Sequence, residues 1–171
     1  KLLIAGEPTL DFSENNAKEC EWYGSSCGGG TYTRMTSWLS KTGLVLESCD
    51  GYVAGDVACN SGCTYQKTLL DWRIICENSV PSTALLQQYI YDNGPVYTVL
   101  YAGDASDAAW ESEYNAYDGT YCMYYDGAWT PNHAVLIVGW DDDLGHAGGT
   151  GGWIVKNSWG TGWGGTCGDG A

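Results

Sequence analysis

Residues 133–160 read HAVLIVGWDDDLGHAGGTGGWIVKNSWG, two runs of β-branched and aromatic residues separated by a polar, glycine-rich segment. The runs 134–140 and 153–156 predict two β-strands, and the segment between them predicts the loop that lets them pair antiparallel. Opposed residues of an antiparallel pair have numbers with a constant sum, about 290–293 for a chain folded about the middle of this loop. His133 and Asn157 sum to 290, so we expect their side chains to face each other.

The expected pairing of His133 with Asn157 has a chemical meaning. A neutral imidazole acts as a base with one ring nitrogen only when the other nitrogen is held as a donor, and an amide oxygen can hold it. Trp159 follows closely and can cover the hydrogen bond from water, which strengthens it. On these residues alone, a structural His–Asn pair that closes a hairpin is the favoured interpretation.

Composition excludes several classes of protein. The 171 residues carry a formal charge of −14, which repels nucleic acid and anionic lipid, and no apolar run approaches the ~20 residues of a membrane span. The eight cysteines fit an oxidising compartment, so we expect a secreted or cell-surface protein. Because no Cys-x-x-Cys pair occurs and only two histidines are present, we expect no metal and no cofactor.

The remaining patterns predict further helices and strands. Helices are expected at 14–20, 32–39 and 83–92, the last begun by a capping serine and ended by an Asn-Gly-Pro sequence. Strands are expected at 96–101 and 119–125.

The composition of the sequence changes near Trp72: cysteine-rich loops and helices are predicted before it, and mainly strands after it. We therefore expect two lobes within one compact chain. Residues 1–72 would form the helical, disulfide-rich lobe, and residues 73–171 a β-barrel-like lobe that carries His133 and Asn157.

Two blocks around His133 and Asn157 carry a specific likeness. Asn-His-Ala-Val at 132–135 and Ile-Val-Lys-Asn-Ser-Trp-Gly-Thr-Gly-Trp-Gly at 154–164 resemble the His and Asn blocks of papain-like cysteine peptidases. Asp-Phe-Ser-Glu-Asn-Asn at 11–16, Cys20 and the Cys-Gly-Gly-Gly run at 27–30 follow the family's order and spacing. The resemblance implies an α+β fold of two lobes, a helical left lobe and an antiparallel β-barrel right lobe, here incomplete at both ends.

The resemblance also implies roles for the paired side chains. His133 would be the general base and the cationic partner of a thiolate, Asn157 would orient it, and Trp159 would shield the pair. The amino-acid sequence of residues 11–16 looks closest to that of the secreted, prokaryotic branch of the family.

The substrate cleft is implied in the same way. Gly29 and Gly30 would offer backbone groups to an extended peptide. Val99 and Ala134 would shape the pocket beside the bond to be cleaved.

Structural disulfides are a further implication of the resemblance. Cys49 and Cys76 have no counterpart in the family that we can place. The implied pairings are Cys27 with a cysteine upstream of Lys1, Cys20 with Cys59 or Cys63, and Cys122 with Cys167 as one available partner.

The nucleophile of such an enzyme is missing from the printed sequence. The family's catalytic cysteine precedes the histidine by ~130–150 residues, and no cysteine occupies positions 1–19. We therefore expect the nucleophile on an N-terminal segment of the same polypeptide, and we expect residues 1–171 alone to be inactive. The predicted function is a cysteine-type endopeptidase that hydrolyses peptides or proteins through a Cys-His-Asn triad. The alternative is a non-catalytic papain-like binding or structural module of a secreted or cell-surface assembly.

Overall fold

The computed structural model describes residues 6–76, 79–160 and 162–164. They divide into two compact units on either side of the bond between Ser79 and Val80. Assigning residues 1–72 and 73–171 to two functional lobes stays a prediction. Within the described ranges, no helix is both long and apolar enough to cross a membrane.

The first unit contains two helices, α1 (Glu14–Cys20) and α2 (Tyr32–Lys41), which confirms the helices predicted there. Ser13 begins α1 because its hydroxyl oxygen accepts a hydrogen bond from the backbone N–H of Asn16 at 2.8 Å. The same hydroxyl donates to the backbone oxygen of Asp50 at 2.5 Å. The cap therefore also attaches the helix to the loop region that follows it in sequence.

A buried carboxylate holds this unit together. Asp50 is 9% exposed, and its two carboxylate oxygens accept hydrogen bonds from the side-chain amides of Asn15 at 3.0 Å and Asn16 at 2.8 Å. Both asparagines lie on the buried face of α1. A charged acceptor strengthens these bonds and offsets the desolvation of the three side chains.

Two disulfides staple the loops of the first unit. Cys20 bonds to Cys59, which selects one of the two partners expected for it. Cys49 bonds to Cys63, a pair that the sequence does not predict. Cys49 directly precedes Asp50, so the second disulfide and the polar links from Asp50 to α1 meet in the same loop.

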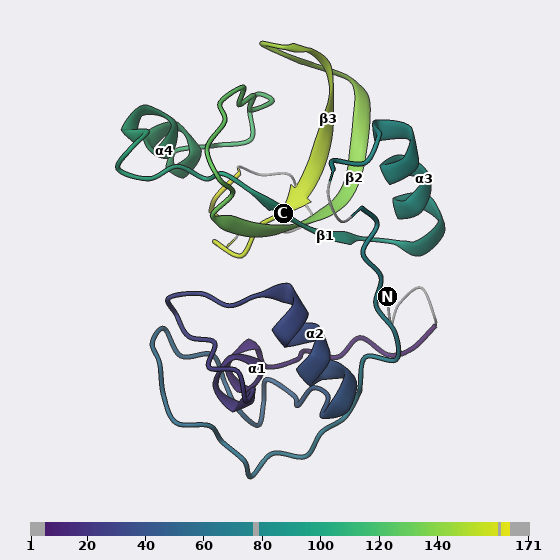
Figure 1. Cartoon of the computed structure of the whole chain (residues 1–171), viewed down its shortest axis with the longest axis vertical. Helices are drawn as coiled ribbons and strands as arrows, with labels where there is room; N and C mark the ends of the chain where they lie inside the picture. Colours follow the sequence, from purple (N-terminus) through teal and green to yellow (C-terminus); the bar gives the residue numbers. More distant parts are fainter. Residues whose placement is uncertain (1–5, 77–78, 161, 165–171) are drawn as a thin grey trace. The chain divides into compact units, whose positions relative to one another are not determined.

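The second unit contains a three-stranded antiparallel sheet in the order β1-β2-β3 (Figure 1). Figure 1 shows β2 and β3 as a long twisted hairpin, with α3 and α4 at opposite sides of the sheet. In chain order the elements are α3 (Thr83–Asn93), β1 (Val96–Leu100), α4 (Ala108–Asn115), β2 (His133–His146) and β3 (Gly149–Lys156). The predicted α3 and β1 are confirmed, and the described strands form an open sheet.

The hairpin has the predicted register but a shorter connection. The pairs Leu136 with Lys156 and Trp140 with Trp153 sum to 292 and 293, within the range expected from the sequence. The predicted loop at 141–152 is wrong, because the strands continue as far as His146 and Gly149. The register shifts at irregular positions along the hairpin, where residues of one strand are left unpaired. The glycine-rich stretch can therefore still pair as an antiparallel ladder.

The strand predicted at 119–125 is also wrong. The side chain of Asp118 accepts hydrogen bonds from the backbone and the hydroxyl of Thr120, at 2.9 and 2.7 Å, and Gly119 has a φ of +78°. This local turn competes with a strand ladder. The tyrosines that favour a strand by composition pack instead against separate neighbouring rings.

Helix α4 is not predicted from the sequence, and it contributes to a core cluster of this unit. Asp107 caps it by accepting from the backbone N–H of Trp110 at 3.3 Å. Trp110 and Tyr114, four residues apart, turn to the same side of the helix, where Tyr114 packs with Ala102 and Trp163. The helix therefore presents an aromatic face to the start of β2.

Candidate active site

His133 and Asn157 meet at the open end of the β2–β3 hairpin. His133 is the first residue of β2, and Asn157 directly follows β3. Nε2 of His133 lies 2.8 Å from Oδ1 of Asn157. The antiparallel ladder thus brings together two side chains that are 24 residues apart, as the register arithmetic predicts.

A second hydrogen bond fixes the tautomer of the imidazole. The backbone N–H of Ser158 donates to the same Oδ1 of Asn157 at 2.7 Å, which identifies that atom as the amide oxygen. An oxygen can only accept, so Nε2 of His133 carries the proton. In the neutral ring, Nδ1 of His133 then holds the lone pair and is the basic atom.

Aromatic rings surround this pair. The Trp159 ring centroid lies 5.0 Å from that of His133 at 45°, which places the indole beside the imidazole as expected. Tyr114 approaches His133 at 6.1 Å with an interplanar angle of 76°, and its ring stands at 90° to Trp159. Apolar faces lower the local dielectric around the His–Asn hydrogen bond.

Tyr114 is the most enclosed of these rings. It is 4% exposed, and its backbone oxygen accepts a hydrogen bond from the indole N–H of Trp163 at 2.8 Å. Burial raises the pKa of Tyr114 to about 12, so its hydroxyl keeps its proton at neutral pH. Trp159, in contrast, is 41% exposed and forms the outer edge of the cluster.

Asn132 attaches the start of β2 to the segment after β1. Its Oδ1 accepts from the backbone N–H of Ala102 at 2.9 Å, and its Nδ2 donates to the backbone oxygen of Gly103 at 2.9 Å. Its own backbone N–H donates to Leu100 at 3.0 Å. These three bonds hold the residue immediately before His133, and so they limit the movement of the imidazole.

Two of the predicted pocket residues lie close to this site. Val99 of β1 and Ala134 of β2 are opposed in the ladder, and both are exposed. They therefore present a small apolar surface beside His133.

The glycine turn with Gly29 and Gly30 belongs to the other unit. The backbone N–H of Gly29 donates to the backbone oxygen of Ser26 at 2.9 Å, and its C=O accepts from the backbone N–H of Ser26 at 3.1 Å and keeps a second lone pair. Gly30 makes no backbone hydrogen bond among the residues that the structure describes. The contact of Gly29 and Gly30 with an extended peptide stays a prediction.

Three thiols have no disulfide partner within the described part of the chain: Cys27, Cys76 and Cys122. Burial raises the pKa of Cys122, which disfavours its thiolate. Cys167 lies outside the described residues, so its pairing with Cys122 stays a prediction, as does the pairing of Cys27 upstream of Lys1.

Comparison with known proteins decides the family. A family model described as papain family cysteine protease matches residues 1–167. The chain belongs to this family. Among papain-family relatives, Peptidase 1 of Euroglyphus maynei is 29% identical over 157 residues, which cover 91% of this chain and 45% of the relative. The cathepsin L-like proteinase of Fasciola hepatica is 33% identical over 161 residues, covering 91% and 44%. The chain therefore spans less than half the length of these relatives.

Solved structures of papain-family proteases share the fold. The bromelain protease from Ananas comosus, in complex with the E64 inhibitor, matches with a TM-score of 0.71 at 22% identity, covering 92% of this chain and 66% of that one. Digestive procathepsin L 3 of Tenebrio molitor matches with a TM-score of 0.66 at 30% identity, covering 95% and 49%. The predicted α+β, papain-like fold is thus confirmed.

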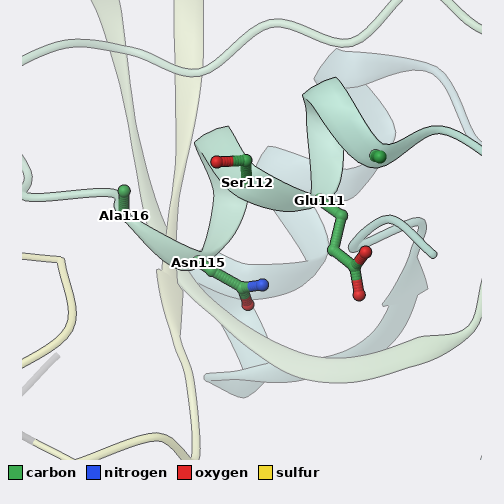
Figure 2. A pocket seen from close by; sticks show the side chains of 5 residues that line it. Glu111, Ser112, Asn115 and Ala116 are labelled. Atoms are coloured by element: carbon green, nitrogen blue, oxygen red, sulfur yellow. The ribbon is translucent and has the colours of Figure 1, made fainter. Parts of the chain in front are cut away.

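A shallow pocket beside α4 lies apart from the His–Asn pair. Figure 2 shows the polar side chains of Glu111, Ser112 and Asn115, which project from α4 and line the pocket. Helical spacing places Ser112 on the opposite side of α4 from Tyr114, which packs in the core cluster, whereas Glu111 precedes Tyr114 by three residues and lies next to it. The residues that line the pocket do not include the aromatic side chains around His133.

Two residues of the site carry no sequence prediction of their own. Asn132 stands in the His block without an implied role, and Tyr114 belongs to neither of the two blocks that carry the resemblance. A local signal for Tyr114 exists, since Asp107 and the aromatic pair Trp110 and Tyr114 mark a capped helix with one apolar face. No sequence signal indicates that this face meets His133.

Proposed function

We propose that this chain is part of a secreted or cell-surface cysteine-type endopeptidase that hydrolyses peptides or proteins. His133 is the general base and Asn157 orients it. The nucleophile is a cysteine thiol on residues that precede Lys1, consistent with relatives about twice as long as this chain. The two disulfides support an oxidising location.

One observation carries the proposal. Asn157 Oδ1 accepts from both His133 Nε2 and Ser158 N, which leaves Nδ1 of His133 as the basic nitrogen. A structural pair needs no particular tautomer, whereas proton transfer with a thiol needs one defined basic atom. The enclosing rings and the Asn132 bonds keep that atom in one orientation.

The reaction follows from this geometry. Nδ1 of His133 accepts the thiol proton, giving a thiolate and an imidazolium whose Nε2–H remains bonded to Asn157. The thiolate attacks the peptide carbonyl, and the carbonyl electron pair moves onto oxygen. When the tetrahedral intermediate collapses, His133 gives the proton to the departing amine. A water molecule, deprotonated by His133, then hydrolyses the thioester and regenerates the thiol.

Further residues would contact the substrate. Gly29 and Gly30 of the first unit would offer backbone groups to an extended peptide, and Val99 with Ala134 would form an apolar contact surface. Trp159 shields the His–Asn hydrogen bond from water. We also propose that the protein belongs to the secreted, prokaryotic branch of the family.

The test compares two histidine variants of the full-length protein. His133→Ala should lower kcat/KM for peptide hydrolysis by about 10²–10⁴-fold and abolish labelling by a thiol-reactive epoxide. His146→Ala is the matched control, because His146 lies at the hairpin tip, stacked on Tyr124 at 4.9 Å. Asn157→Ala should reduce turnover less than His133→Ala and leave the fold intact.

Undiminished hydrolysis by the His133→Ala protein would refute the mechanism. A folded wild-type protein that neither hydrolyses peptides nor reacts with the epoxide would instead favour a non-catalytic binding module.

A further inference from the structure

Two buried polar atoms beside His133 have no hydrogen-bond partner among the described residues. They are the hydroxyl oxygen of Tyr114 and the amide nitrogen Nδ2 of Asn157. An unsatisfied buried donor or acceptor costs about 1–3 kcal/mol, so two such groups on side chains that flank one imidazole require an explanation.

The Asn157 amide cannot solve the problem by turning over. Its oxygen already accepts two hydrogen bonds, from His133 at 2.8 Å and from Ser158 at 2.7 Å. A flipped amide would place its NH₂ group against the backbone N–H of Ser158, which is also a donor. Nδ2 must therefore find an acceptor where it is.

The Tyr114 hydroxyl has the matching chemistry, and its ring belongs to the aromatic cluster around His133. Tyr114 packs edge-on against His133 at 6.1 Å, and His133 is bonded to Asn157. Both orphaned groups thus belong to side chains that contact one imidazole, one from α4 and one from the end of β3. A protonated phenol can accept and donate, whereas Nδ2 can only donate.

We propose that Tyr114 is a positioning residue whose hydroxyl holds the Asn157 amide through one buried water. The water accepts from Nδ2 of Asn157 and donates to the oxygen of Tyr114, so each orphaned atom gains a partner. Tyr114 acts on His133 only through Asn157. Its link to catalysis rests on the proposed function, but the hydrogen bonds themselves do not.

The hydroxyl, and not the ring, carries this role, so Tyr114→Phe is the informative variant. Packing alone predicts that Tyr114→Phe is neutral or stabilising, because it removes a buried hydroxyl without a partner and keeps the ring. The water bridge predicts in addition a change at the imidazole. Without the bridge, Asn157 gains freedom to move, and the Nε2 proton of His133 becomes more accessible to solvent.

The experiment measures exchange of the Nε2 proton of His133 by NMR in the full-length protein. Tyr114→Phe should speed this exchange about fivefold, the effect of one neutral hydrogen bond. His146, the second histidine of residues 1–171, is an internal reference in the same spectrum. Tyr117→Phe is the matched control, because its hydroxyl donates to the backbone oxygen of Tyr121 at 2.8 Å.

A double-variant comparison isolates the amide. Asn157→Asp replaces Nδ2 by oxygen and removes the donor, so Tyr114→Phe added to it should produce no further change in exchange. In peptide hydrolysis, Tyr114→Phe should lower kcat about threefold to tenfold at unchanged KM, and the pH profile of kcat should shift.

A measurement on the wild type needs no variant to fold. The Nδ2 protons of Asn157 should exchange slowly and show a nuclear Overhauser effect to a long-lived water. Absence of that water, or unchanged His133 exchange in Tyr114→Phe, overturns the inference. Neither of these two measurements involves the thiol. Hydrolysis that survives His133→Ala would therefore refute the proposed function and leave the role of Tyr114 standing.

Discussion

Replacing Asn132 by alanine removes both side-chain hydrogen bonds that fix the backbone before His133. Each bond is 2.9 Å long and joins a neutral amide to the backbone, and each contributes about 1 kcal/mol. The expected loss is about 2 kcal/mol in the free energy of unfolding, or about 4–8 °C in Tm for a chain of this size. Because His133 follows directly, kcat/KM for peptide hydrolysis should also fall about tenfold.

Thermal unfolding by circular dichroism and a peptide hydrolysis assay test this expectation. Asn93→Ala is a matched control: Asn93 is also exposed, and its side chain donates to the Tyr89 backbone oxygen at the end of α3. Its effect on stability should stay within about 0.5 kcal/mol. Asn132→Asp keeps the acceptor for Ala102 and loses the donor to Gly103, so it should fall between wild type and alanine in stability. Equal Tm and equal turnover for Asn132→Ala and Asn93→Ala would show that these bonds do not position the imidazole.

Two further predictions concern the backbone that supports the site and the loops of the first unit. Gly103→Ala should destabilise the protein by at least about 2 kcal/mol in denaturant unfolding, because φ is +95° and the added Cβ would lie 2.3 Å from Cα of Glu111. Gly145→Ala, where a Cβ meets nothing within 4 Å, should be near neutral, and equal losses would contradict this reasoning. The backbone N–H of Cys27 lowers the pKa of Asp56, so the stability that Asp56 contributes is present above its unfolded pKa and is lost as pH falls through the lower, folded pKa. Asp56→Asn should therefore flatten the decline of Tm between about pH 5 and pH 2, and an unchanged decline would refute the link.

Local chemistry makes part of the structure predictable. Ser13 and Ser82 mark the starts of α1 and α3 because a serine hydroxyl satisfies a backbone donor within its own turn. The register of β2 and β3 follows from the symmetry of an antiparallel pair, and this symmetry is enough to predict that His133 and Asn157 face each other.

Contacts between segments that are far apart in the sequence cannot be predicted from such local chemistry. The bond between Cys49 and Cys63 depends on how a loop without periodicity folds, and cysteine spacing does not encode that path. The segment after Asp118 has strand-like composition, but one side-chain turn overrides it. The contact of Tyr114 with His133 arises because α4 packs on the start of β2, a relationship between elements with no local signature.

The turn of the β2–β3 hairpin lies at one end of its ladder, and the paired His133 and Asn157 lie at the other end. His146 and Gly149 flank the tip, whereas His133 and Asn157 occupy the base. Residues inserted at the tip would lengthen the connection without changing the register below it. The tip is therefore a suitable place to attach a fluorescent reporter or an affinity tag while the imidazole and its amide partner keep their geometry.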